Sequence, residues 1–199
     1  AVPVSRAALD AGANGVAVAL VEEGVQLREA GIEAPILVLS EPVSDAADVV
    51  VEYTLTPVVY TPLGVEALAK AVASSGRRRA PFDVHLKVDT GMNRVGCRID
   101  EALDLATQVV SRTVLRLAGT WTHFAVADEG DNPYTTQQIA RFEHLVGRLR
   151  AAGIDPGLVH ACNTAGALAF PAARGDLVRI GIGLYGIAPA PSLSGVVAL

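Results

Sequence analysis

Hydrophobic residues in this chain fall into short runs that alternate with segments of helical periodicity. The runs are rich in valine, isoleucine and leucine. Several contain almost no polar residue, which is typical of strands buried on both faces of a sheet. The pattern predicts seven strands, at residues 15–20, 35–40, 48–55, 84–89, 117–124, 158–164 and 177–186.

Apolar residues recur every three or four positions in the segments between these runs, as in amphipathic helices. Three of the segments end at a glycine, which commonly follows a helix C-terminus: Gly31, Gly76 and Gly153. The pattern predicts helices at residues 5–12, 22–31, 64–76, 100–112 and 135–153.

Alternating strands and helices favour βα units around a parallel sheet. The chain opens on a helix before seven predicted strands, so we expect an α/β fold of the (β/α)8 TIM-type barrel class with about seven of eight strands present. Residues 1–199 are then one barrel domain. A doubly wound open sheet is the rival, but it usually carries a GxGxxG turn, and the sequence contains none.

Composition narrows the classes of function. The 199 residues are 51% hydrophobic, enough for a sizeable core, and the net charge of -5 argues against a nucleic-acid binder. The basic run Arg77–Arg79 is predicted to be a solvated loop. Cys97 and Cys162 form neither a zinc spacing nor a disulfide framework. With no signal peptide and no membrane-spanning stretch, we expect a cytoplasmic protein without a metal site.

Polar residues gather where the predicted strands end. In a (β/α)8 barrel, function collects at the C-terminal ends of the strands, and phosphate sites often follow the last two. A hydroxyl and unhindered backbone N–H groups suit a phosphate. The residues at these ends are Asp89, Thr90, Arg94, His123, Asn163, Thr164, Arg179, Gly181 and Ile182.

Two cations are hard to explain as structural residues. Lys87 and Arg179 lie inside apolar runs, and a buried cation needs a partner or an anionic ligand. By contrast, His123 is equally compatible with packing, and Asn163 with capping the next helix. His160 has no polar neighbour in sequence and is predicted to pack in the core.

The tripeptide Asp89-Thr90-Gly91 also occurs in aspartic proteases. Those enzymes are all-β proteins and use two such aspartates that share a proton. This chain is rich in helical segments and holds a single Asp-Thr-Gly. The sequence therefore disfavours a protease.

Four motifs carry a resemblance to a known family: KVDTGMNRVG, WTHFAVADE, HACNTAG and VRIGIGLYGIAP, with EEGVQLREAGIEAPILVLSEP nearer the start. In order and spacing they resemble bacterial alanine racemase, over essentially all 199 residues. The resemblance implies a pyridoxal phosphate (PLP) enzyme with a barrel and a β-rich C-terminal domain. It would work as a homodimer that interconverts L-alanine and D-alanine for peptidoglycan.

The resemblance also implies roles for the cations and the histidine. Arg94 would reach the phenolic oxygen of PLP and the substrate carboxylate. His123 would pack on the pyridine face, and Arg179 would donate to the pyridine nitrogen. Lys87 stands where many members carry a carbamylated lysine, a modification that would turn a buried cation into an anion.

The remaining roles concern the rim of the cofactor and its phosphate. Leu39 resembles an apolar rim residue. Thr164 resembles a phosphate-binding hydroxyl, with Asn163 beside it, and Gly181 and Ile182 resemble backbone donors to the phosphate.

Both proton-transfer groups of the family are missing from the 199 residues. The Schiff-base lysine motif would precede Ala1, the tyrosine of the C-terminal domain would follow Leu199, and the sequence holds only Lys70 and Lys87. We therefore expect a cofactor cradle that is inactive by itself. Alternatives are a non-catalytic PLP-binding module, an inactive truncated product, and a racemase for another amino acid.

Overall fold

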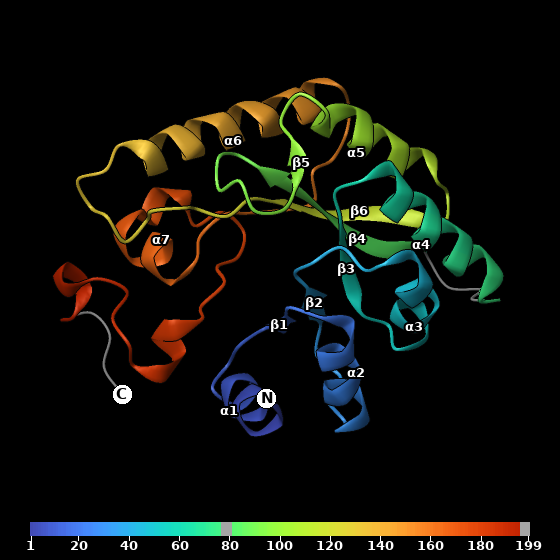
Figure 1. Ribbon diagram of the computed structural model, residues 1–199, viewed down its shortest axis with the longest axis horizontal. Helices are drawn as coiled ribbons and strands as arrows, with labels where there is room; N and C mark the ends of the chain where they lie inside the picture. Colours follow the sequence, from blue (N-terminus) through green and yellow to red (C-terminus); the bar gives the residue numbers. More distant parts are fainter. Residues whose placement is uncertain (77–80, 196–199) are drawn as a thin grey trace. The chain divides into compact units, whose positions relative to one another are not determined.

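The computed structural model describes residues 1–76 and 81–195, so the basic run at 77–79 lies outside the described residues. Figure 1 shows the helices and strands in chain order. The α-helices are α1 (Val2–Asp10), α2 (Val21–Glu29), α3 (Ala47–Glu52), α4 (Pro62–Ser74), α5 (Ala102–Ser111), α6 (Tyr134–Ala151) and α7 (Thr164–Ala169). The strands are β1 (Val16–Val18), β2 (Ile36–Val38), β3 (Thr56–Val59), β4 (Phe82–Asp89), β5 (Cys97–Arg98), β6 (Leu115–Trp121) and β7 (Leu158–His160).

These strands form one sheet in the order β1-β2-β3-β4-β6-β7, with β5 attached to β4. The pairing is parallel from β1 to β4, and again between β6 and β7. The register places Val16 opposite Ile36 and Gly119 opposite Leu158. The prediction of βα units around a parallel sheet is confirmed.

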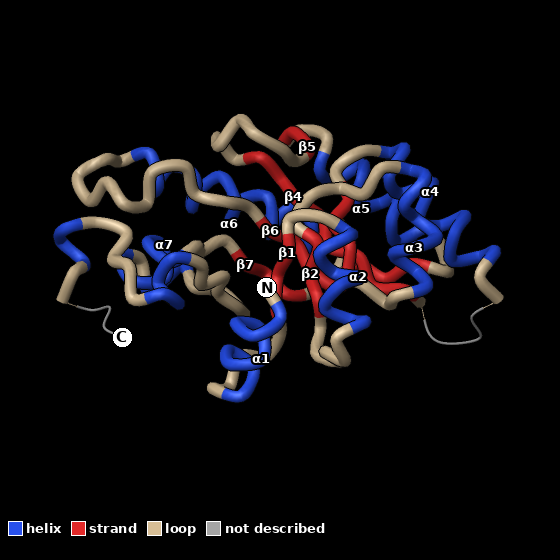
Figure 2. The backbone as a smooth tube through the Cα atoms, turned by 60° about the horizontal axis from the view of Figure 1, so that its bottom comes forward, coloured by secondary structure: helices blue, strands red, loops and turns tan. Residues whose placement is uncertain are grey.

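The chain divides into two compact units, and the division cuts two long strands. The first unit holds residues 1–86 and 104–117, and the second holds 87–103 and 118–199. In the first unit, β1 and β2 lie beside α2, as Figure 2 shows. Leu27 of α2 is 1% exposed, and Ile36 of β2 and Val58 of β3 are 0% exposed.

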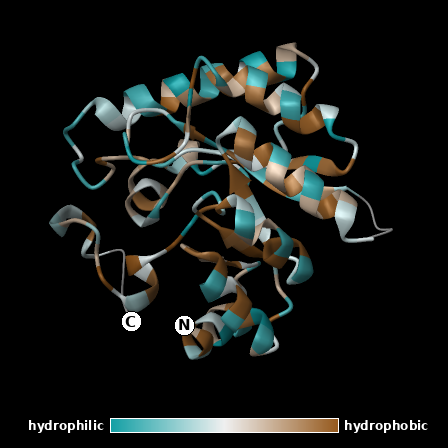
Figure 3. Ribbon diagram, turned by 45° about the vertical axis from the view of Figure 1, so that its right-hand side comes forward, coloured by the Kyte–Doolittle hydropathy of each residue, from teal (hydrophilic) through white to brown (hydrophobic). Residues whose placement is uncertain are grey.

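The second unit is organised around α6. Its buried residues Phe142, Leu145, Val146 and Leu149 follow helical spacing, so one face packs inward and the other meets solvent. In Figure 3 the helices carry both hydrophobic and hydrophilic stripes. None of the helices in the described ranges is long and apolar enough to cross a membrane.

Five of the seven predicted strands are found, with shifted or shorter bounds, and the one at 48–55 is wrong. Its first part forms α3, in which the buried residues Ala47, Val50 and Val51 follow helical spacing. The valine run conceals this period because β-branched residues favour strands. The real strand β3 contains Pro57, and an internal proline argues against a strand in sequence.

The strand predicted at 177–186 is also wrong. Residues 177–180 are irregular, and Ile182–Tyr185 form a 3-10 helix. Its turns close through bonds from Leu184 N to Gly181 O and from Gly186 N to Gly183 O. Gly186 has a φ of 70°, a conformation that ends a regular strand but suits glycine. The closely spaced glycines therefore allow tight turns here, although the alternating apolar residues are typical of a strand.

One glycine lets β7 approach β6 closely. Gly157, directly before β7, has a φ of 62°, and a Cβ there would lie 2.3 Å from the carbonyl carbon of Ala118. That contact is with backbone, which cannot rotate away as a side chain could.

Replacing Gly157 with alanine should therefore lower the free energy of unfolding by more than about 2 kcal/mol, since backbone strain and steric overlap add. Gly153→Ala is the matched control. It carries left-handed strain of about 1–2 kcal/mol, but its Cβ would meet no atom within 4 Å. Chemical denaturation of the two variants measures the difference, and equal losses of stability would contradict the steric account.

Candidate functional site

The second compact unit contains nearly all of the residues that the sequence singled out. Lys87, Arg94, His123, Asn163, Thr164, Arg179, Gly181 and Ile182 all lie in it. Leu39 lies in the first unit, directly after β2, where its backbone N–H donates to Val18 O at 2.8 Å. The role given to Leu39 stays a prediction.

The Arg179 side chain joins the ends of β6 and β7. Its Nη2 donates to Thr122 O at 2.8 Å and to Ala161 O at 2.9 Å. Nη1 lies 2.6 Å from His160 Nδ1, and Nη2 lies 3.3 Å from His123 Nδ1. Because guanidinium only donates, His160 Nδ1 must accept from Nη1, and the neutral His160 ring carries its proton on Nε2. The two hydrogens of Nη2 are directed at the two carbonyl oxygens.

Trp121, at the end of β6, contacts two cations, Lys87 and Arg179, through the face of its ring system. It is 1% exposed. Lys87 Nζ lies 4.3 Å and Arg179 Cζ lies 4.4 Å from the centre of its ring system. His160 stacks on it with ring centres 5.5 Å apart. An indole face attracts cations through its quadrupole, which offsets part of the cost of placing two cations together.

Burial and mutual repulsion weaken the protonated forms of these groups. Burial, followed by the charges of Arg94 and Arg179, lowers the pKa of Lys87 to about 8. Burial also lowers the pKa of Arg179 to about 10. Within the described residues no hydrogen-bond partner of Lys87 Nζ is present, although the side chain is buried. Lys87 is thus buried, as the sequence predicted, and its role in binding an anion stays a prediction.

His123 is neutral in this environment. Burial lowers its pKa to about 4, and the charges of Arg179, Arg94 and Lys87 act in the same direction. A neutral imidazole presents an uncharged flat face, which can pack against an aromatic ring.

The segment after β7 meets the 3-10 helix through Thr164. The Thr164 hydroxyl is buried and accepts from Gly181 N at 3.1 Å and from Gly183 N at 3.4 Å. Asn163 caps α7 by accepting from Gly166 N at 2.9 Å, so its predicted capping role is confirmed. Ile182 is 47% exposed and is the first residue of this 3-10 helix.

The loop after β4 is shaped by Asp89. Its Oδ1 accepts from Gly91 N at 2.7 Å and from Asn93 N at 3.1 Å, forming a local turn that leads to Arg94. Arg94 is exposed. Its charge nevertheless acts on both Lys87 and His123, so the loop brings a third cation to the site.

Sequence reasoning missed the polar residues of α6. Gln138 is fully buried and bonds to Thr90 Oγ1 and His123 O. Arg141 donates to Thr90 O at 2.9 Å, and Tyr134 OH donates to Gly91 O at 2.9 Å. These three residues follow helical spacing on one face of α6, a signal that the sequence does contain.

For His160 the sequence predicted burial in the core but not its contacts with the site. It is fully buried, as expected of a core residue, but it also bonds to Arg179 and stacks on Trp121. Its place in the motif HACNTAG was the available signal.

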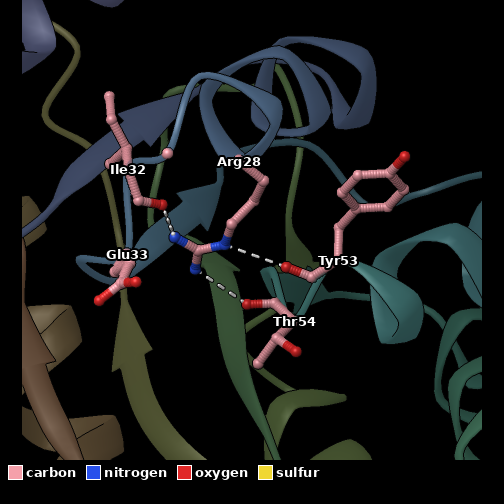
Figure 4. Close-up of a pocket in the computed structure, with 6 residues that line it drawn as sticks. Arg28, Ile32, Glu33, Tyr53 and Thr54 are labelled. Atoms are coloured by element: carbon pink, nitrogen blue, oxygen red, sulfur yellow. Dashed lines mark hydrogen bonds between the residues drawn. The ribbon is translucent and has the colours of Figure 1, made fainter.

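A concavity of about 340 Å³ lies in the first unit beside Arg28. Figure 4 shows the Arg28 guanidinium among backbone carbonyls. It donates to the carbonyls of Tyr53 and Thr54 at 3.0 and 3.1 Å, and to those of Ile32 and Ala34. These bonds tie the end of α2 to the loop before β2 and the turn before β3. That is the N-terminal side of these strands, where polar residues serve stability in this type of fold.

Comparison with known sequences decides the family. Residues 1–189 match the family described as "Alanine racemase, N-terminal domain". The chain belongs to the alanine racemase family. The resemblance inferred from the four motifs is thereby confirmed.

Curated members of the alanine racemase family resemble the whole chain. The alanine racemase of Treponema denticola is 42% identical over 202 residues, covering 100% of this chain and 52% of that protein. The alanine racemase of Symbiobacterium thermophilum is 43% identical over 200 residues, with the same coverage of 100% and 52%. The chain spans about half the length of these relatives.

Solved structures of the family share the fold. The alanine racemase of Bacillus anthracis with bound L-Ala-P has a TM-score of 0.88 and 34% identity, covering 100% of this chain and 50% of that one. The alanine racemase of Clostridium difficile has a TM-score of 0.88 and 30% identity, covering 96% of this chain and 52% of that one. The predicted fold class, an incomplete TIM-type barrel, is confirmed.

The electrostatic arrangement predicts how His123 titrates. In the cofactor-free protein its ring should stay neutral until the pH approaches about 4. Because this pKa is lower in the folded than in the unfolded state, the residue reduces stability as the pH falls from about 6.5 towards 4. Imidazole NMR resonances followed against pH give the value. Arg179→Met should return the pKa of His123 only part of the way to its ordinary value, since burial is the larger cause of the shift. An ordinary His123 pKa in the unsubstituted protein would contradict the arrangement.

Proposed function

We propose that this chain forms the cofactor cradle of a PLP-dependent racemase that interconverts L-alanine and D-alanine. The observation that carries the proposal is the gathering of three cations, Lys87, Arg94 and Arg179, around a neutral His123. Such a site needs anions, and both the phosphate of PLP and the carboxylate of an amino acid are anions. The names of the relatives support the same activity.

The donor set after β7 fits a phosphate. Gly181 N and Gly183 N converge on the Thr164 hydroxyl, and the same N–H groups and hydroxyl can donate to phosphate oxygens instead. A Cβ at Gly181 would meet no atom within 4 Å, so the backbone there is open to a ligand. Backbone N–H groups at the start of a helical turn are a common anion site. We assign phosphate binding to Thr164, Gly181 and Ile182, with Asn163 holding the turn.

Arg179 and His123 fit the ring of the cofactor. Among the described residues the Arg179 Nε–H has no partner, so it is free to donate to a ring nitrogen. When bound, PLP would supply an electron sink that acidifies the Cα–H of an amino acid. A guanidinium stays protonated and cannot pass its proton to that nitrogen. Arg179 would thus hold the ring nitrogen neutral, limiting charge delocalisation and favouring return of a proton to Cα.

Arg94 is assigned to the substrate carboxylate and the phenolic oxygen, because it is the exposed cation of the site. Neither lysine of the sequence is placed like a catalytic base: Lys70 is exposed on α4, and Lys87 is buried beside Trp121. We propose that the 199 residues by themselves do not racemise alanine. The intact enzyme would act as a homodimer, as the resemblance implies.

The intact protein should bind PLP and interconvert the alanine enantiomers. Thr164→Val should weaken PLP binding about 10-fold to 100-fold, because it removes one hydrogen bond to a charged group. Thr136→Val, at an exposed position of α6, is the matched control and should change nothing. Absorbance titration with PLP and a coupled assay for D-alanine give the two readouts. PLP binding without racemisation would favour a non-catalytic PLP-binding module.

Lys87 is proposed to be carbamylated. Its lowered pKa, about 8, leaves part of the amine neutral near physiological pH. The neutral Nζ can then attack CO2, forming an N–C bond and releasing a proton to solvent. The product is an anion that the charges of Arg94 and Arg179 would stabilise, and it would replace the buried positive charge.

Isotope-labelled bicarbonate should therefore give a carbamate NMR signal that disappears in Lys87→Met. Lys70→Met, at the exposed lysine, should keep the signal. The signal should grow as the pH rises through about 8. A signal that survives Lys87→Met would assign the modification elsewhere.

A further inference from the structure

Gln138 is a buried polar residue beneath the candidate site. It lies in the second turn of α6 and is 0% exposed. Burying a carboxamide without partners costs stability, so such a residue is expected to make all of its bonds. A leucine or methionine would fill the same space at lower cost. The presence of glutamine therefore calls for an explanation in what it bonds.

The bonds fix the carboxamide in one orientation. Its Oε1 accepts from Ala125 N at 2.9 Å, and its Nε2 donates to His123 O and to Thr90 Oγ1, both at 3.1 Å. An amide N–H can only donate and a carbonyl can only accept, so a flipped carboxamide would lose both backbone bonds. Gln138 thus bonds to the backbone on both sides of Phe124, at His123 O and Ala125 N.

These bonds reach two of the segments to which we assign ligand-binding groups. One is the segment after β6, which contains His123. The other starts at Thr90 after β4 and leads to Arg94. Thr90 Oγ1 also lies 2.8 Å from Thr122 Oγ1, so the two loops are joined through Gln138 and Thr122.

From this geometry we infer that Gln138 is a positioning residue, which sets the His123 ring and the Arg94 loop for binding the cofactor and substrate. The inference rests on the proposed function. Gln138 itself takes no part in the chemistry. Its effect passes through the His123 carbonyl, the Ala125 N–H and the Thr90 hydroxyl.

Two substitutions separate positioning from simple packing. Gln138→Met keeps the approximate volume and removes all three bonds. Gln138→Glu keeps the shape of the side chain but replaces the donating Nε2 with an oxygen. A protonated glutamic acid can still donate once and accept from Ala125 N. Its carboxylate would instead place an anion against the His123 carbonyl. Burial raises the pKa of such a carboxyl, so the introduced glutamic acid should lose its proton within the pH range in which activity can be measured.

The experiment uses the intact protein with PLP. Gln137→Met and Gln137→Glu, one residue away at an exposed position, are the matched controls. Gln138→Met should lower kcat/KM about 10-fold to 100-fold, because small displacements of positioning groups have effects of this size. PLP binding should weaken about 10-fold. Gln138→Glu should gain a new fall in activity as the pH rises, absent from the unsubstituted protein and from Gln137→Glu.

A second readout does not depend on activity. In the cofactor-free protein, the imidazole resonances of His123 should shift in Gln138→Met and stay unchanged in Gln137→Met. Loss of thermal stability with unchanged kcat/KM, PLP affinity and His123 resonances would overturn the inference, since it would make Gln138 a packing residue. Failure of the proposed function looks different, because the unsubstituted protein would then neither bind PLP nor racemise alanine.

Discussion

The hydrogen bonds of one guanidinium hold the ends of β6 and β7 together. Arg179 donates to the carbonyls of Thr122 and Ala161, contacts two histidine rings and lies over Trp121. A partly buried cation is stable only if its N–H groups are bonded, so the surrounding backbone must present carbonyls at fixed places. The arrangement of the site follows from satisfying this one group.

The same cation determines the charge state of its neighbours. Since Arg179 must donate, His160 Nδ1 must accept, and the His160 ring is therefore neutral with its proton on Nε2. Arg94 and Lys87 add positive charge and lower the pKa of His123 further. The described residues offer Lys87 no hydrogen-bond partner. A site of this kind stays electrostatically unbalanced until anions bind, which suits a phosphate and a carboxylate.

Sequence patterns predicted the strands correctly where a single local preference acted, and incorrectly where two preferences favoured different structures. The strands predicted at 84–89 and 117–124 correspond to β4 and β6. In 48–55 the β-branched valines favoured a strand, although the burial of Val50 and Val51 follows a helix. In 177–186 the apolar alternation favoured a strand, although the glycines close tight turns. Gln138 was missed because its partners lie up to 48 residues away along the chain.

The sequence by itself determined the alternation of strands and helices, the family, and the residue types of the site, because periodicity and motif spacing are local properties. Only the tertiary structure decided which groups meet. It brought His160 to Arg179, placed two cations on Trp121 and put Gln138 beneath His123. Such contacts depend on how distant segments pack and on which buried polar groups must be satisfied, and no single stretch of sequence contains that information.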